Sequence, residues 1–149
     1  MKNKLEITLQ TIHLGSARRI VTLAFNGKDV AYDFLSGIEK FNSQGFKAIK
    51  TRMRVIAENL HYENQQIFRN LGNNIYEIKI RSGLRLYVFL DQLDSSNQQL
   101  VIATCGGKKN TKKEQSQDIR RAQQLRDRYL QAKDQESTLI NLIKLPYES

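Results

Sequence analysis

The sequence predicts an α+β fold in which two helices near the N-terminus pack on a twisted, mainly antiparallel sheet. Three observations point to this class: a β-branched run at 20–25, apolar residues at helical spacing over 30–60, and alternating or continuous apolar segments after residue 75. The predicted order is strand, helix, helix, strand, strand, strand, helix. With 149 residues and no internal repeat or linker, residues 1–149 are expected to form one domain.

Two predicted strands precede the helices. Residues 5–12 alternate weakly, like an edge strand, and residues 20–25 form a stronger strand that ends at the turn Asn26-Gly27. Either segment is a candidate for the first strand of the sheet, or the two pair with each other. We therefore treat residues 1–17 as an additional strand-like head.

The apolar period then becomes helical. The first stripe comprises Val30, Phe34, Ile38 and Phe41, and the second comprises Phe46, Ile49, Met53, Ile56 and Leu60. A polar cluster at 42–45 separates them. These stripes predict two consecutive helices that form a hairpin, with both stripes in the core.

Two alternating segments follow at 75–81 and 85–90. A three-residue loop at 82–84 would place Arg81 opposite Arg85 and Lys79 opposite Tyr87, with the aliphatic side chains together on the other face. After a polar loop, residues 99–105 form a continuous apolar strand that is expected to be central in the sheet.

The last predicted helix begins at Lys112, because Thr111 and Glu114 have the spacing of a capping box. Its apolar stripe comprises Ile119, Ala122, Leu125 and Tyr129. The tail at 134–149 contains too many aliphatic residues for a free end. We expect it to pack on the domain or on a second copy in a homodimer.

Composition limits the possible chemistry. A single cysteine, Cys105, and two histidines exclude an internal disulfide and leave no residue set for a structural zinc site. The first residues lack the apolar core of a signal peptide, and no apolar run reaches the roughly 18 residues of a membrane span. We therefore expect a cytoplasmic protein that uses no metal or cofactor and contacts no membrane.

The full chain has a net charge of +9, and half of its basic residues lie in one segment. Residues 79–133 carry 12 Lys and Arg against 5 Asp and Glu, a net +7. This excess favours a polyanionic partner, most often nucleic acid. A solvated basic surface would have the same composition.

The predicted hairpin brings like charges together on one sheet face. Arg81 opposite Arg85, with Lys79 beside them, would destabilise the sheet by up to about 1 kcal/mol unless an anion lies among them. The glycines at 106–107 place Lys108 and Lys109 at the rim of the same face. The alternative is that these cations pair with nearby carboxylates and are otherwise solvated.

Three segments, 73–81 (NNIYEIKIR), 84–89 (LRLYVF) and 102–111 (IATCGGKKNT), have the order and spacing of a known family. With the helix start at Lys112 and the segment 26–35 (NGKDVAYDFL), they resemble the RelE/ParE toxin superfamily, closest to its phage-derived HigB-like branch. The resemblance covers about residues 20–131. It implies a RelE-like toxin of a type II toxin–antitoxin system. Such toxins are metal-independent endoribonucleases that cut mRNA, usually on the ribosome. A small DNA-binding antitoxin, expected to be a helix-turn-helix protein, silences them.

The resemblance also implies the chemistry of the site. The ribose 2′-hydroxyl attacks the adjacent phosphate, which requires a base, cations for the developing charge and an acid for the leaving 5′-oxygen. The residues predicted to be catalytic are Lys79, Arg81, Arg85, Tyr87 and Lys109. The residues predicted to bind RNA are Lys108, Lys112, Lys113, Arg120 and Arg121. Some relatives carry an aromatic residue or histidine at the position that falls near Gln115 in this chain. The amide side chain of Gln115 cannot transfer a proton at neutral pH. Tyr87 is the remaining candidate for an acid, a base or a ring that stacks on an RNA base. The alternative is that it is a half-buried aromatic residue of the sheet.

The missing proton-transfer group keeps a second hypothesis open. The chain could be a non-nuclease toxin of the same fold, such as a ParE-like gyrase inhibitor, or an inactive nucleic-acid-binding protein. Of the other candidates, His13 and His61 are expected at the surface and Cys105 in a core strand. Asp91 and Asp94 are expected in a turn rather than in a carboxylate pair of a nuclease.

Overall fold

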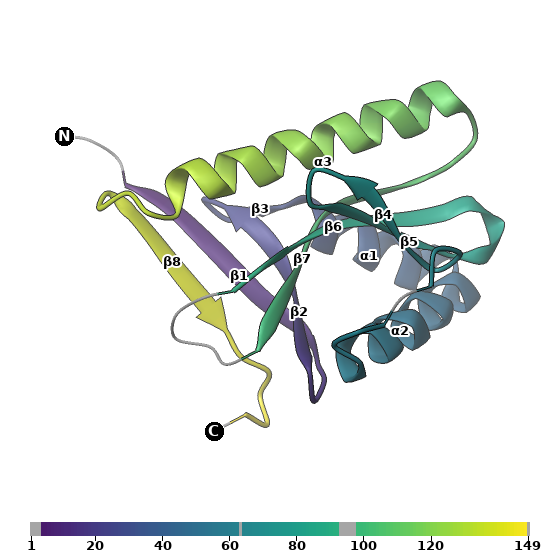
Figure 1. Cartoon of the computed structure of the whole chain (residues 1–149), viewed down its shortest axis with the longest axis horizontal. Coiled ribbons are helices and arrows are strands. Elements are labelled where there is room, and N and C mark those ends of the chain that lie inside the picture. Colours follow the sequence, from purple (N-terminus) through teal and green to yellow (C-terminus); the bar gives the residue numbers. More distant parts are fainter. Residues whose placement is uncertain (1–3, 63, 93–97, 149) are drawn as a thin grey trace.

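A mixed sheet with helices on both faces forms the body of the molecule (Figure 1). The computed structural model describes residues 4–62, 64–92 and 98–148, without the side chain of Arg81. In this part of the chain the sheet has eight strands, in the order β4-β5-β6-β7-β2-β1-β8, with β3 paired to β2. The strands are β1 (Leu5–Leu14), β2 (Arg18–Phe25), β3 (Lys28–Asp29), β4 (Phe68–Gly72), β5 (Ile75–Lys79), β6 (Leu84–Asp91), β7 (Gln99–Lys108) and β8 (Thr138–Ile143). The helices are α1 (Val30–Phe41), α2 (Ser43–Glu58) and α3 (Lys112–Ala132).

The predicted α+β class is therefore confirmed, but the predicted element order is incomplete. The head forms β1, which pairs antiparallel with β2, so the alternative in which the two early segments pair is correct. The turn after β2 uses Asn26 and Gly27 with φ of 51° and 85°, as the Asn-Gly dipeptide predicts. It leads into β3, a short strand that the sequence pattern did not predict.

Helices α1 and α2 cover one face of the sheet. Asp29 caps α1 by accepting a hydrogen bond from the Tyr32 amide at 2.9 Å, and Asn42 caps α2 through the Gly45 amide at 3.0 Å. The predicted stripes are correct at most positions but wrong at two. Phe41 is 82% exposed because it is the last residue of α1, and Leu60 is 45% exposed because α2 already ends at Glu58.

Helix α3 lies across the opposite face, so the sheet separates two apolar cores (Figure 1). Thr111 accepts a hydrogen bond from the Glu114 amide at 3.1 Å, which confirms the predicted helix start. Ala122 and Tyr129 are fully buried, and Ile119 and Leu125 pack beside them, as the stripe predicted.

Two further strands were missed, and both lie at the edges of the sheet. One is β4, paired antiparallel with β5. The other is β8, which pairs parallel with β1 and shows that the apolar tail packs on its own domain. Beyond β8, Glu148 forms an ion pair with Arg19 at 2.6 Å, with only 9% of either side chain exposed.

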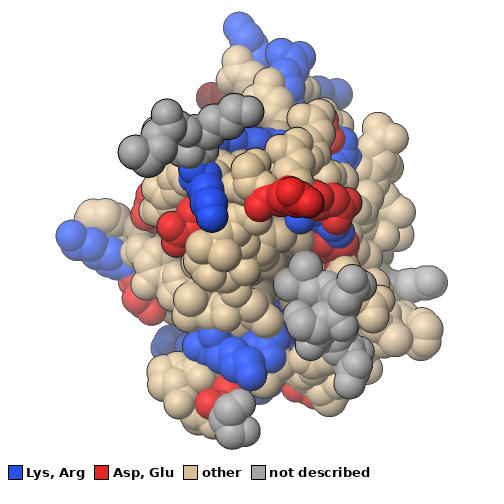
Figure 2. Space-filling view, turned by 90° about the vertical axis from the view of Figure 1, so that its left-hand side faces the viewer, with Lys and Arg blue, Asp and Glu red and all other residues tan. Residues whose placement is uncertain are grey.

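The β8 side of the molecule faces the viewer in Figure 2. Basic and acidic side chains are interspersed there with uncharged surface, so this side carries no single-sign patch among the described residues. Leu139 and Ile143 of β8 are 52% and 46% exposed. No helix in the described ranges is long and apolar enough to cross a membrane.

Candidate nucleic-acid interface

The hairpin of β5 and β6 has a register different from the predicted one. Lys79 lies opposite Arg85 and Glu77 opposite Tyr87, so the predicted pairings of Lys79 with Tyr87 and of Arg81 with Arg85 are wrong. The connection is two residues longer than predicted, because a 3-10 turn at Arg81–Gly83 replaces the expected extension of the strands. The observed register differs from the predicted one by two residues. Because side chains alternate between the two faces of a strand, a shift by two residues keeps each side chain on the same face, and the predicted separation of charged and aliphatic faces still holds.

A buried ion pair neutralises Arg85. Its Nε lies 2.5 Å from Oε1 of Glu77, and its Nη1 donates to the Leu84 carbonyl at 2.9 Å and to the Ile80 carbonyl at 3.2 Å. Gln115 of α3 donates to the same Glu77 oxygen at 3.3 Å. The alternative in which a carboxylate pairs with the predicted cations is therefore correct for Arg85.

Tyr87 lies beneath α3 and is only 1% exposed. Burial, followed by the charges of Glu77 and Asp118, raises the pKa of its phenol far above the ordinary value. The ring packs in the core that contains Phe89 and Tyr129. In this conformation Tyr87 neither stacks on an RNA base nor accepts a proton, and it acts as the sheet aromatic of the alternative interpretation.

The remaining predicted lysines lie at one end of the molecule, where the β5–β6 turn, the end of β7 and the start of α3 meet (Figure 1). The amide of Lys109 donates to the Gly83 carbonyl at 2.7 Å, which ties the end of β7 to this turn. We call the following set the basic end: Lys79, Arg85, Lys108, Lys109, Lys112 and Lys113. Lys79 is half-buried, and the four lysines from 108 to 113 are exposed.

Three other predicted residues lie beside or outside the basic end. Arg120 and Arg121 are exposed on α3, about 12 Å further along the helix axis than Lys112 and Lys113. They extend the positive surface away from the hairpin rather than adding to it. The side chain of Arg81 lies outside the part of the chain that the structure describes.

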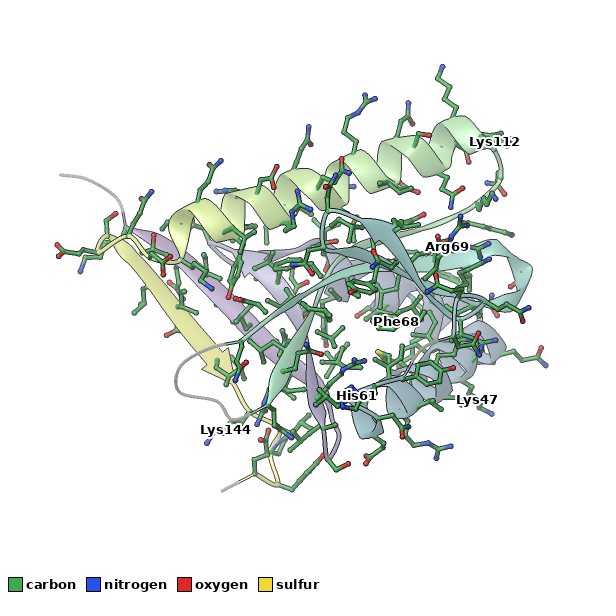
Figure 3. The ribbon with its side chains drawn as sticks, in the orientation of Figure 1. Lys47, His61, Phe68, Arg69, Lys112 and Lys144 are labelled. Carbon is green, nitrogen blue, oxygen red and sulfur yellow. The ribbon has the colours of Figure 1, made fainter. Side chains whose placement is uncertain are left out.

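Two residues near the basic end were not predicted. Arg69 of β4 lies opposite Glu77 and is exposed, and Figure 3 shows it at the same end as Lys112. Asp118 lies on the sheet-facing side of α3 and leaves no space for a side chain at Gly107, which in turn pairs with Arg85. Burial is the main cause that raises the pKa of Asp118, while Arg121 opposes the shift.

The signals for these two residues differ in strength. Asp118 precedes Ala122 by four positions, so a carboxylate on the apolar stripe of α3 was visible in the sequence. Arg69 lies in β4, whose sequence FRNLG lacks a strand pattern.

The lesser candidates have structural roles or surface positions. His61 is exposed, as predicted, and His13 is half-buried beside Lys50 and Arg54, where burial lowers its pKa. Cys105 is 1% exposed and burial raises its pKa to about 11, in agreement with a core position.

Asp91 is the last residue of β6 rather than part of the predicted turn. Asp91 accepts hydrogen bonds from the Tyr129 hydroxyl at 2.7 Å and from Lys133 at 3.0 Å, so it fastens α3 to β6. Asp94 lies outside the described residues. No group of His, Cys, Asp and Glu side chains that could hold a metal is found within 4–62, 64–92 and 98–148.

The described arrangement places the cations of the basic end near Asp118, a carboxylate whose pKa is raised by burial. No family model, curated protein or solved structure matches the chain. The resemblance to RelE/ParE toxins therefore depends on the sequence motifs alone.

Proposed function

We propose that this chain is the toxin of a type II toxin–antitoxin system and cleaves mRNA on the ribosome without a metal ion. The supporting observation is the basic end, where Lys79 of β5, Lys109 directly after β7 and Lys112 of α3 surround one turn. A set of cations at one end suits a phosphate backbone, whose contacts supply most of the affinity in nucleic-acid binding. A small helix-turn-helix antitoxin would hold the toxin inactive.

In the proposed reaction, the ribose 2′-oxygen attacks the adjacent phosphorus and the bond to the 5′-oxygen breaks. This leaves a 2′,3′-cyclic phosphate and a 5′-hydroxyl. Lys79 and Lys109 stabilise the extra negative charge of the transition state. Arg85 is paired with Glu77, so it shapes the edge of the site and adds little net charge there.

Asp118 is the proposed general base in place of the residue missing at Gln115. A carboxylate whose pKa is raised by burial takes up a proton more readily than an exposed one. The proton of the 2′-hydroxyl passes to Asp118, while water or a lysine ammonium protonates the leaving 5′-oxygen. The cleavage rate should then rise with pH until Asp118 is ionised.

The test is cleavage of a reporter mRNA in a translation extract. We expect Lys79→Ala to reduce the cleavage rate at least tenfold, and Asp118→Asn to reduce it and to remove the acidic limb of the pH–rate profile. Lys28→Ala, which removes an exposed lysine of β3, is the charge-matched control. Full activity in Lys79→Ala would refute the assignment of the basic end, and an unchanged pH profile in Asp118→Asn would refute the role of Asp118.

The second candidate is a non-nuclease toxin of the same fold, for example a ParE-like gyrase inhibitor, or an inactive nucleic-acid-binding protein. The buried pair of Arg85 and Glu77 favours it, because this guanidinium is already neutralised, as does the burial of Tyr87. Inhibition of DNA supercoiling by gyrase, without cleavage of any RNA, would establish this candidate over the nuclease.

A further inference from the structure

A cavity of about 320 Å³ lies on the side of the sheet opposite the basic end, beyond the C-terminus of α2. Its volume is at the lower limit of sites that hold small ligands. The lining side chains used below are Arg18, His61, Tyr62, Phe68, Asn70 and Tyr76. Figure 3 shows His61 and Phe68 at this place, between α2 and the sheet.

Arg18 gives the cavity a buried positive charge. The residue is 5% exposed, and its Nη2 donates to the Leu60 carbonyl at 2.5 Å. Its guanidinium lies 5.6 Å from the centre of the Phe68 ring. No carboxylate pairs with Arg18 among the residues that the structure describes, and burial lowers its pKa. A desolvated cation held only by carbonyls and a ring is unfavourable, which creates a preference for an anionic ligand.

The rest of the lining presents rings and amides. Phe68 stacks on Tyr76 with centroids 4.8 Å apart, and Tyr62 and His61 add two more flat groups. Asn70 accepts a hydrogen bond from the Gly72 amide at 2.8 Å, so its own NH₂ group is available to donate to a ligand. None of the described lining residues is acidic.

This combination matches the chemistry of an unpaired nucleotide. Aromatic side chains stack on bases, amides bond to base edges, and an arginine balances the phosphate. We propose that the cavity binds one unpaired nucleotide. The inference depends on the proposed RNA-binding function only in taking that nucleotide from the bound RNA, since a free mononucleotide offers the same groups.

The two sites are connected by the edge of the sheet. Arg69 and Asn70 are consecutive residues of β4, an edge strand, so one lies beside the basic end and the other lines the cavity. On β5, Lys79 and Tyr76 are about 10 Å apart along the strand, on opposite faces. An RNA strand bound at the basic end can therefore pass over β4 and place a nucleotide in the cavity.

The test measures binding to the full chain. The probes are a 2′-O-methyl RNA hexamer, which resists 2′-hydroxyl chemistry, the same hexamer with abasic positions, and the mononucleotides AMP and UMP. We expect Tyr62→Leu to weaken binding of the hexamer by about 5-fold to 150-fold, the range for loss of one base stack. Asn70→Asp keeps the hydrogen bond to Gly72 but adds a negative charge, and it should weaken binding at least fivefold.

The charge-matched control is Gln131→Glu, an exposed residue in the last turn of α3, far from the basic end and from the cavity. The inference would be overturned if Tyr62→Leu and Asn70→Asp bound the hexamer as tightly as this control and if the abasic hexamer bound as tightly as the intact one. That result would leave RNA binding at the basic end possible. Binding of AMP or UMP that Asn70→Asp abolishes, without any binding of RNA, would instead support the cavity and contradict the proposed function. Absence of binding by every probe would refute both.

Discussion

The buried pair of Arg85 and Glu77 is predicted to be worth more to folding than any single lysine of the basic end. Glu77 is 1% exposed, and apart from Arg85 its only described donor is Gln115 at 3.3 Å. Removing one partner of a buried ion pair costs about 3–5 kcal/mol, because the other charge stays buried. The substitution Arg85→Met leaves the more deeply buried partner alone, so we expect a cost near the upper value.

The reverse substitution should cost less. Glu77→Leu leaves Arg85 with its bonds to the Leu84 and Ile80 carbonyls and with 11% of its side chain exposed, which suggests a cost near 3 kcal/mol. The double variant Arg85→Met/Glu77→Leu removes both charges. Replacing a buried pair by apolar residues of similar volume is often neutral, so the double variant should be more stable than Arg85→Met alone.

Urea unfolding followed by circular dichroism measures all three free energies of unfolding. If the cost of the double variant equals the sum of the two single costs, or if Arg85→Met costs less than about 1 kcal/mol, the pair is not coupled as argued. A double variant that folds where Arg85→Met does not would support the coupling equally well. Loss of RNA cleavage in an Arg85 variant cannot be separated from loss of folding, which is why Lys79 is the better probe of the site.

Three further predictions concern the rest of the fold. Gly106→Ala should lower stability by about 1–3 kcal/mol, measured by urea unfolding, because a methyl group there meets the Phe34 ring and the Arg85 carbonyl; a cost below 0.5 kcal/mol would contradict this packing. Truncation after Lys133 removes β8 and should increase binding of a hydrophobic dye and lower the melting temperature, whereas an equally stable monomer would refute a structural role for the tail. Since burial raises the pKa of Cys105 to about 11, the folded state holds this proton more tightly than the unfolded state. Stability contributed by Cys105 is thus complete below about pH 9 and is lost up to pH 11, so Cys105→Ala should show a shallower loss over that window.

Local signals predicted the parts of the fold that depend on neighbours in sequence. The Thr111 cap, the turn at Asn26 and the apolar stripe of α3 are set by residues within a few positions of one another, and all three are confirmed. The strands β4 and β8 depend on distant partners. β4 carries Asn70 and Gly72 in a five-residue strand, and only its pairing with β5 makes it extended.

The candidate site was harder to predict than the fold. Its chemistry depends on the register of the β5–β6 hairpin and on which face of that hairpin α3 covers. A loop longer by two residues put Lys79 opposite Arg85, and in this loop both Ser82 and Gly83 have a positive φ, of 68° and 83°. Nothing local indicates that α3 lies on the charged face of the hairpin. Helix α3 buries Tyr87 and brings Gln115 to Glu77, so part of the charged face of the hairpin is buried.

The parallel pairing of β1 with β8 constrains the order in which the molecule assembles. Leu5 is paired with Thr138, so this contact closes a loop that includes almost every other element, and the entropic cost of closure is greatest here. We expect β8 to join late in folding and to show the fastest amide hydrogen exchange in the sheet. Until it joins, the edge of β1 offers unpaired amides and carbonyls to neighbouring chains, which makes this step the point of greatest aggregation risk.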